Sequence, residues 1–370
     1  MKKVGIITLY GEYNFGNRLQ NYALQEYLKK YDVIPISLKN NSYSNKKKFY
    51  YINRGVYFLR NLKRMITRKE AYRTDPNRLA RFREFNSLIY FSPRYITAKN
   101  IKSFKDLDYF VVGSDQVWNP NFDGLSDIMT LSDIERKKKV AYAASFGVSQ
   151  LEDKYIEKVK KNIAEFNYIS VRENEGKRII ESNTNRDDVE VLIDPTMLLD
   201  AKEWNKVFKK PNNYNGEKYI LNYFLGEIPM NIKKIIEDFA IKNNCKVINI
   251  LDKKDPFYAC GPSEFLYLEK NAFLICTDSF HSSVFAILFD RPFKVFERQD
   301  SLDGKVNMNS RIYTLLTKFK LEDRYFNGIL DEIALNTSYD DVSDILSNER
   351  AKTDSFFRKA LDIENQYGKK

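Results

Sequence analysis

"KKVGIITLYGEYNFGNRLQNYALQEYLKKYDVIPISL", residues 2–38, decides the fold of this chain. It begins with a β-branched, apolar run that predicts a buried strand, and a polar loop containing two glycines follows. In residues 18–31 the apolar side chains recur at helical spacing, and residues 32–38 read as a second strand. A strand, a helix and a strand in this order predict a βαβ unit with a parallel sheet.

The same alternation of strands and helices continues through the rest of the chain. Further strands are expected in residues 108–114, 139–147, 168–174, 189–199, 218–226, 246–251, 272–279 and 292–297. Further helices are expected in residues 174–181, 231–244, 263–271, 281–290 and 310–319. Since a polar stretch at 209–218 separates two sets of similar size, we expect an α/β fold of two doubly wound, Rossmann-like domains facing a cleft.

The domain boundaries follow from this pattern and from the length of 370 residues, which suits two domains of ordinary size. Residues 1–200 are expected to form an N-terminal Rossmann-like domain, with a basic helical insertion at about 41–100. Residues 201–340 are expected to form a C-terminal Rossmann-like domain. Residues 341–370 are expected to form a C-terminal helix that can return to the N-terminal domain.

Composition excludes several classes of protein. No apolar run approaches the roughly 20 residues needed to cross a bilayer, and the apolar stretch Val4–Leu9 is too short for a signal peptide. Three cysteines and a single histidine do not make a zinc site of the usual kind. We therefore expect a cytoplasmic, reduced protein with no metal and no cofactor.

The positive charge is concentrated in one segment. Residues 46–83 hold 13 Lys and Arg against two acidic residues, whereas the whole chain has 61 against 50. The rest of the chain is therefore balanced in charge. Within the segment, apolar residues recur at helical spacing and arginines and lysines occupy the other faces, which predicts a basic amphipathic helix. Such a helix can lie on an anionic membrane, or pack on its own domain with a solvated cationic face.

The single histidine, His281, lies in "ICTDSFHSSVFAILFDRP", residues 275–292. The pattern predicts a buried strand, a turn and a buried helix with His281, Ser282 and Ser283 in its first turn. Free backbone N–H groups at a helix N-terminus bind phosphate or carboxylate, and an imidazole can transfer a proton near neutral pH. The alternative is structural: Asp278 or Ser279 caps the helix and His281 is a satisfied core residue.

Other polar residues follow predicted strands in the same way. Asn17 follows the first strand in a loop with Gly11 and Gly16, and Asp115 follows another in "VVGSDQVWNP". The first loop matches neither the dinucleotide nor the Walker pattern, so it suits an acidic or sugar ligand or is a simple turn.

Two arginines are candidates for an anion clamp. Arg172 directly follows an apolar strand, and Arg311 opens a predicted helix. A guanidinium in either place can bind a carboxylate or phosphate through two N–H groups, and the alternative is a solvated surface arginine.

In this order, these pieces resemble the polysaccharide pyruvyl transferase family. The residues that carry the resemblance are "GEYNFGNRLQNYALQEYL" (11–28), "VVGSDQVWNP" (111–120), "AYAASFG" (141–147), "ISVRENEG" (169–176), "IDPTMLL" (193–199), "ICTDSFHSSVFAILFDRPF" (275–293) and "NSRIYTLL" (309–316). The family pattern has glycine after the histidine, where this chain has Ser282.

The resemblance implies a fold like that of the two-domain GT-B glycosyltransferases. It also implies transfer of the pyruvyl group of phosphoenolpyruvate to a sugar diol of a cell-surface polysaccharide, or of its lipid-linked precursor, as a ketal. His281 is then the acid or base. The residues expected at phosphoenolpyruvate are Arg172, Arg311, Ser279, Ser282 and Ser283, and those expected nearer the sugar are Asn17 and Asp115.

Two other functions remain open from the sequence. The chain could be a nucleotide-sugar glycosyltransferase on the same fold, or a catalytically silent relative that binds sugar or a lipid carrier. We expect no nucleic-acid partner, because the basic segment lacks a recognisable binding module. If residues 46–83 bind an anionic membrane, the protein is peripheral at the inner membrane face.

Overall fold

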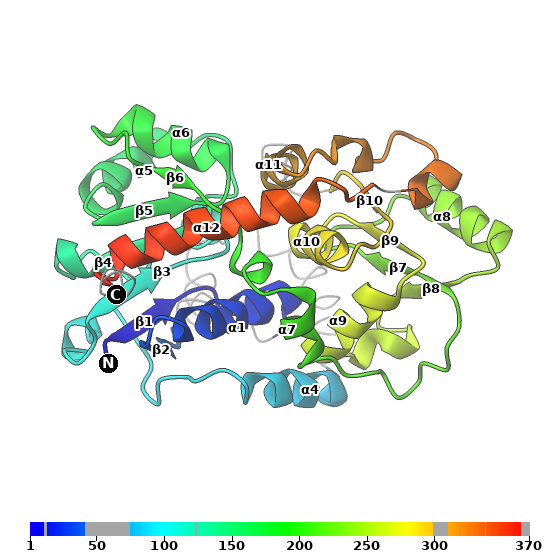
Figure 1. Cartoon of the computed structure of the whole chain (residues 1–370), viewed down its shortest axis with the longest axis horizontal. Coiled ribbons are helices and arrows are strands. Elements are labelled where there is room, and N and C mark those ends of the chain that lie inside the picture. The colour runs from blue at the N-terminus through cyan, green and yellow to red at the C-terminus, as the bar shows by residue number, and fades with distance from the viewer. Residues whose placement is uncertain (11–12, 41–74, 123–124, 299–309, 337, 364–370) are drawn as a thin grey trace, which may run out of the picture.

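A computed structural model describes the chain except residues 11–12, 41–74, 123–124, 299–309, 337 and 364–370. It has two lobes, each built on a parallel sheet with helices packed around it (Figure 1). The predicted α/β class with two Rossmann-like lobes, the GT-B-like arrangement, is confirmed. The predicted basic helix, in residues 54–73, lies outside the described residues.

The N-terminal lobe contains a sheet of six parallel strands. These are β1 (Lys3–Ile7), β2 (Ile34–Ser37), β3 (Tyr109–Val112), β4 (Lys139–Ala144), β5 (Tyr168–Val171) and β6 (Glu190–Val191). The helices of this lobe include α1 (Phe15–Lys29), α5 (Asp153–Lys158) and α6 (Asn174–Asn183). The strand order is β2-β1-β3-β4-β5-β6, so the direction of winding reverses between β1 and β3. Ligands of open α/β sheets bind at the carboxyl ends of the strands beside such a reversal.

Helix α1 forms where the sequence predicts it, because its apolar residues face the sheet. Leu19, Ala23 and Leu28 are fully buried in the core beneath it. Asn14 caps the helix, since its side-chain oxygen accepts a hydrogen bond of 3.1 Å from the backbone N–H of Asn17. The cap places Asn17 at the carboxyl end of β1.

The C-terminal lobe repeats the same winding on a smaller sheet. Its strands are β7 (Tyr219–Tyr223), β8 (Lys246–Asn249), β9 (Leu274–Thr277) and β10 (Phe293–Val295), in the order β10-β9-β7-β8. Its helices are α7 (Ala201–Asn205), α8 (Met230–Lys242), α9 (Pro262–Asn271), α10 (Phe280–Leu288) and α11 (Ser310–Lys318). The reversal here lies between β7 and β9, and α10 begins directly after β9.

The final helix, α12 (Val342–Ala360), passes from the C-terminal lobe across the N-terminal lobe (Figure 1). Its Phe357 ring lies 4.6 Å from the ring of Tyr142 on β4. Arg350 Nε donates a 2.9 Å hydrogen bond to the Met197 carbonyl, and Tyr31 Oη donates one of 2.9 Å to Asp354 Oδ1. These contacts attach the end of the chain to the N-terminal lobe.

The two lobes also share a hydrophobic core. Phe15 on α1 stacks on Phe265 of α9 with ring centroids 4.5 Å apart. The described part of the predicted insertion adds α4 (Pro76–Asn86), whose Arg78 donates to the Tyr258 carbonyl and whose Arg81 pairs with Glu264. These two arginines of the basic segment therefore contact the C-terminal lobe. Among the helices that the structure describes, none is both long and apolar enough to span a bilayer.

Candidate functional site

The reversal point of the N-terminal sheet brings together two residues that are far apart in sequence. Asn17 follows β1 and Asp115 follows β3, and Asn17 Nδ2 donates a hydrogen bond to Asp115 Oδ2. Asp115 Oδ1 accepts a 2.8 Å bond from the backbone N–H of Gln116. Both side chains are more than nine-tenths buried. The structure thus places the two predicted sugar-binding residues in contact at one strand edge.

Arg172, at the carboxyl end of β5, lies between two carboxylates. Its Nη1 donates a 2.8 Å hydrogen bond to Asp194 Oδ2, and its Nη2 lies 3.5 Å from Asp115 Oδ1. Its guanidinium stacks over the Phe280 ring, 4.3 Å from the centroid. The alternative of a solvated surface arginine is wrong, because Arg172 is only 4% exposed.

Asp194 is a member of the cluster that sequence reasoning missed. It lies three residues beyond β6, directly after Leu192 and Ile193, and its Oδ1 accepts hydrogen bonds of 3.0 and 2.7 Å from Thr196 N and Oγ1. Its Oδ2 accepts from Ser114 Oγ at 2.9 Å and from Arg172. The sequence signal that could have identified Asp194 is an acidic residue that follows an apolar strand and precedes Pro195. Because β6 is only two residues long, the predicted strand at 189–199 ran past Asp194.

The two aspartates are held in the ionised form. Burial alone would raise the pKa of each, but nearby cationic groups outweigh it and leave the pKa of both below the usual value. For Asp194 these groups are His281, in its protonated form, and Arg172, and for Asp115 they are Arg172, protonated His281 and Arg311. Hydrogen bonds from Thr196 to Asp194 and from Gln116 to Asp115 lower the two pKa values further. The N-terminal lobe therefore presents two fixed negative charges that Arg172 partly neutralises.

His281 enters the same cluster from the C-terminal lobe. It lies in the first turn of α10, is 8% exposed, and its Nε2 is 3.8 Å from Asp194 Oδ2. That separation is too long for a hydrogen bond, and Nε2 has no hydrogen-bond partner among the described residues. Burial lowers the pKa of His281 despite the two aspartates, and Arg172 and Arg311 lower it further. The free protein therefore holds a neutral imidazole that can accept a proton.

The absence of a side chain at Gly16 allows the two lobes to approach closely at His281. A Cβ atom at residue 16 would lie 2.2 Å from Nδ1 of His281, so any larger residue would displace the ring. Sequence reasoning assigned this glycine to a flexible loop, whereas the structure places it in the first turn of α1 against the imidazole. Gly11 lies outside the described residues.

Arg311 is the buried cation of the site that has no ion pair to a carboxylate within the described part of the chain. It lies at the start of α11 and is 5% exposed. With its side-chain oxygen turned toward the guanidinium, Gln116 accepts hydrogen bonds of 2.6 and 2.7 Å from the two terminal nitrogens. Arg311 Nε has no partner among the described residues. Burial, together with Arg172 and Arg298, lowers the pKa of Arg311 to about 9, although the more distant carboxylates of Glu173 and Asp115 oppose this shift. Arg311 therefore stays charged at neutral pH without a direct ion pair among the described residues.

The three predicted serines are buried beside His281, but their hydrogen bonds go elsewhere. Ser282 Oγ donates a 2.6 Å bond to Glu269 on α9, and Ser283 Oγ donates a 3.0 Å bond to the Ser279 carbonyl. Burial raises the pKa of Glu269 well above its usual value. Ser279 is the N-cap of α10, yet its side chain makes no capping bond. The role predicted for these hydroxyls at phosphoenolpyruvate stays a prediction.

The Asp278 carboxylate binds a loop of the C-terminal lobe, whereas one interpretation of the sequence made it the N-cap of the helix that contains His281. The carboxylate accepts hydrogen bonds of 2.7 and 2.8 Å from the backbone N–H groups of Leu225 and Gly226, in the loop after β7. Arg298 Nε donates to the same carboxylate at 3.1 Å. Asp278 therefore ties the loop after β7 to the start of α10.

The fold and this cluster define a two-lobed α/β protein with buried cationic groups and one imidazole where the lobes meet. Comparison with known families then identifies the group to which it belongs. The model of the polysaccharide pyruvyl transferase family matches residues 14–300, and the chain is a member of that family. The resemblance inferred from the sequence motifs is thereby confirmed.

No curated protein sequence matches the chain. Among solved structures, it is similar to a UDP-GlcNAc 2-epimerase from Neisseria meningitidis, with 11% identity, 95% of this chain and 100% of the other covered, and a TM-score of 0.45. An Acinetobacter baumannii MurG shares 9% identity over 98% of this chain and 99% of its own, with a TM-score of 0.39. Likeness at this level says nothing about substrate.

Proposed function

We propose that the protein transfers the pyruvyl group of phosphoenolpyruvate to two hydroxyls of one sugar, forming a ketal and releasing phosphate. The observation that carries this proposal is Arg311, a buried cation without a carboxylate partner in the described part of the chain, in the same cluster as His281. Membership of the family supports the transferase class. Phosphoenolpyruvate has a carboxylate and a phosphate, and either one could form the direct ion pair that Arg311 lacks among the described residues.

The reaction adds one proton to carbon and removes one proton from each of two hydroxyls. A proton adds to the terminal methylene carbon of phosphoenolpyruvate, and the neighbouring carbon then accepts the oxygen of the first sugar hydroxyl, which loses its proton. The bond from that carbon to the phosphate oxygen breaks, phosphate leaves with the electron pair, and the second hydroxyl adds with loss of its own proton. One of the two hydroxyl protons replaces the one that the carbon received, and the other leaves on phosphate.

His281 suits these transfers because its protonation state responds to the ligand. The neutral ring of the free protein can accept a proton from a hydroxyl, and the charges of bound phosphoenolpyruvate would raise its pKa and favour the acid form. Asp194 then acts as a positioning group, since Thr196, Ser114 and Arg172 hold its carboxylate facing the imidazole. Arg311 would stabilise the charge that develops on the departing phosphate.

A transfer assay tests the proposal. The purified protein is incubated with phosphoenolpyruvate and a soluble oligosaccharide of the polysaccharide that the source cell makes, and phosphate release and the product mass are measured. The proposal requires one phosphate released for each ketal formed, and only with the acceptor present. Glycosyl transfer from a nucleotide sugar, without use of phosphoenolpyruvate, would replace it with the glycosyltransferase alternative.

Membrane association through the basic segment stays a prediction. The described end of that segment contacts the C-terminal lobe through Arg78 and Arg81, so a test deletion must spare them. Removal of residues 46–74 is expected to abolish binding to anionic phospholipid vesicles and to leave transfer to a soluble acceptor intact. Unchanged vesicle binding would contradict the prediction.

A further inference from the structure

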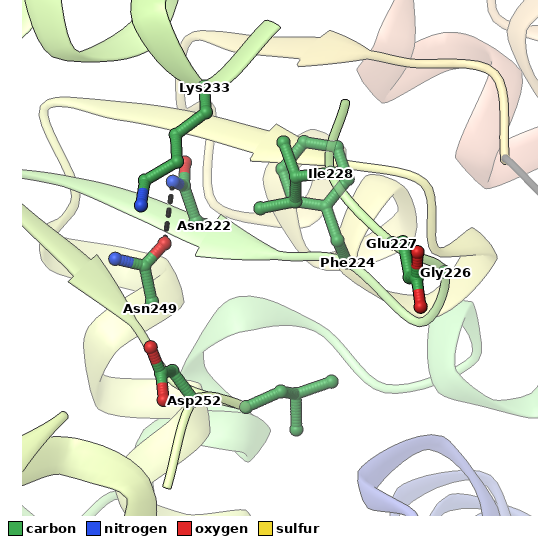
Figure 2. Close-up of a pocket in the computed structure, with 9 residues that line it drawn as sticks. Asn222, Phe224, Gly226, Glu227, Ile228, Lys233, Asn249 and Asp252 are labelled. Carbon is green, nitrogen blue, oxygen red and sulfur yellow. Dashed lines mark hydrogen bonds between the residues drawn. The ribbon is translucent and has the colours of Figure 1, made fainter. Parts of the chain in front are cut away.

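The C-terminal lobe contains a cavity of about 510 Å³ at the carboxyl ends of β7 and β8, beside the start of α8 (Figure 2). Its size is typical of pockets that hold small ligands. Asn222 and Asn249, at the ends of the two strands, point toward each other in it, and Asn222 Nδ2 donates a 2.9 Å hydrogen bond to Asn249 Oδ1. None of the residues in the His281 cluster lines this cavity.

One buried polar atom of the cavity wall has no hydrogen-bond partner among the described residues. Asn222 is 4% exposed, and its Oδ1 makes no hydrogen bond to any described residue. A buried amide oxygen is usually satisfied, so an unsatisfied one in the wall of a cavity indicates a ligand that donates a hydrogen bond. A hydroxyl or an amine of a ligand would satisfy it.

The charges of the cavity disfavour a phosphorylated ligand. Glu227 and Asp252 contribute two carboxylates, whereas Lys233 contributes one ammonium group and lies 3.8 Å from Glu237 on its own helix. The lining is therefore net negative, and a phosphate or diphosphate would be repelled. Carboxylates and an amide oxygen accept hydrogen bonds from hydroxyl groups instead.

The remaining walls are apolar. Phe224, Ile228 and Leu251 line the cavity, and the ring of Phe224 is fixed by that of Phe296, with centroids 5.3 Å apart. An aromatic and aliphatic wall beside several acceptors suits a sugar ring, which has hydroxyls at its edge and C–H groups on its faces.

The cavity is coupled structurally to the start of the His281 helix. Gly226 lines it, and the backbone N–H of Gly226 donates to Asp278, which precedes His281 by three residues. A glycan that occupied the cavity would therefore lie next to the carboxyl end of β9, where α10 begins.

We propose that this cavity binds a neutral sugar residue of the acceptor glycan, other than the sugar that receives the ketal. The identity of the ligand as acceptor rests on the proposed function. The cavity then selects the acceptor by its neighbouring sugar, and it does so without contact to phosphoenolpyruvate.

Saturation-transfer NMR with four neutral disaccharides, maltose, cellobiose, lactose and N,N′-diacetylchitobiose, tests the proposal on the full chain. At least one of them is expected to bind. Asn222→Leu, which keeps the size of the side chain and removes the unpartnered oxygen, should weaken that binding on the order of tenfold. Asp252→Asn should weaken it several-fold. Asp238→Asn, the same change on α8 outside the lining residues, should leave it unchanged.

Calorimetry with phosphoenolpyruvate separates failure of this inference from failure of the proposed function. Asn222→Leu and Asp252→Asn should bind phosphoenolpyruvate like the unmodified protein, which also shows that they fold. The inference is overturned if no disaccharide binds, if Asn222→Leu binds it as well as the unmodified protein does, or if UDP displaces the disaccharide. Disaccharide binding without phosphoenolpyruvate binding would overturn the proposed donor and keep the cavity as a sugar site.

Discussion

The two lobes contribute buried charged groups to one cluster, but they compensate those charges differently. In the N-terminal lobe, Arg172 lies between Asp115 and Asp194, and Asp194 receives further hydrogen bonds from Thr196 and Ser114. In the C-terminal lobe, and among the described residues, Arg311 makes hydrogen bonds only to the Gln116 amide and no ion pair, and His281 Nε2 has no hydrogen-bond partner.

This difference distinguishes residues that hold the site in place from residues that are available to bind a ligand. Burying a charge without an ion-pair partner costs free energy, so such a charge is expected where a bound ligand supplies the partner. The N-terminal lobe is therefore the fixed half of the site. The C-terminal lobe supplies Arg311, which can bind an anion, and His281, which can accept a proton. Substitutions in the two halves should have opposite consequences for stability and for activity.

The largest effect is expected for His281→Gln. The amide keeps a polar side chain of similar length but cannot transfer a proton, so the transfer rate should fall by about 10² to 10⁴. Phosphoenolpyruvate affinity should change little, because Arg311 remains. Activity within a few-fold of the unmodified protein would exclude His281 as the acid or base and favour the structural interpretation.

The two arginines should respond oppositely to substitution by methionine. Arg172→Met leaves two buried aspartates without their cation and should reduce the free energy of unfolding by about 3 to 5 kcal/mol. Arg311→Met removes a buried charge that has no direct ion pair among the described residues, so stability should be unchanged or higher. Denaturant unfolding measures both values. Equal destabilisation by the two changes would show that Arg311 has a structural partner.

Gly16→Ala tests the close contact between the lobes. The added Cβ would fall 2.2 Å from His281 Nδ1, so the ring or α1 must move, at a cost of about 1 to 3 kcal/mol. The rate of pyruvyl transfer should also fall, because the imidazole is displaced. Gly176→Ala, whose Cβ meets its nearest neighbour, Val171, at 3.3 Å, is the matched control on α6. Full activity of Gly16→Ala would contradict the geometry.

The smallest expected effect is a shift in the titration of His281, which NMR can follow without ambiguity because the chain has one histidine. In the free protein its pKa should lie below 6.5, so the imidazole favours folding fully above that pH and destabilises the fold as pH falls. Phosphoenolpyruvate should raise the midpoint by about one pH unit or more. A midpoint that does not respond would place the ligand away from His281.

Much of the fold could be predicted from the sequence, because strands and helices alternate with clear periods of apolar residues. The carboxyl ends of parallel strands converge, which is why the strand pattern assigns Asn17, Asp115 and Arg172 to one edge of the N-terminal sheet. His281 follows a strand of the other sheet, and only the family resemblance joined it to them. Asp194 was not predicted because β6 has only two residues, so the apolar pattern does not show where the strand ends. The contact between Gly16 and His281 depends on how the lobes dock, and no local pattern encodes that distance.

The serines after His281 illustrate the limit of motif reading. A helix N-terminus rich in hydroxyls predicts anion binding, but Ser282 bonds to Glu269 and Ser283 to the Ser279 carbonyl. Whether a hydroxyl faces a neighbouring helix or a ligand depends on packing between α9 and α10. The sequence contains no separate signal for it.

The most direct test of the central claim is calorimetric titration with phosphoenolpyruvate of the unmodified protein, of Arg311→Met and of Arg178→Met, an exposed arginine on α6. The account predicts saturable binding that Arg311→Met weakens by about 10- to 100-fold and Arg178→Met leaves unchanged. Equal binding by Arg311→Met and the unmodified protein, or no binding by any of the three, would contradict it.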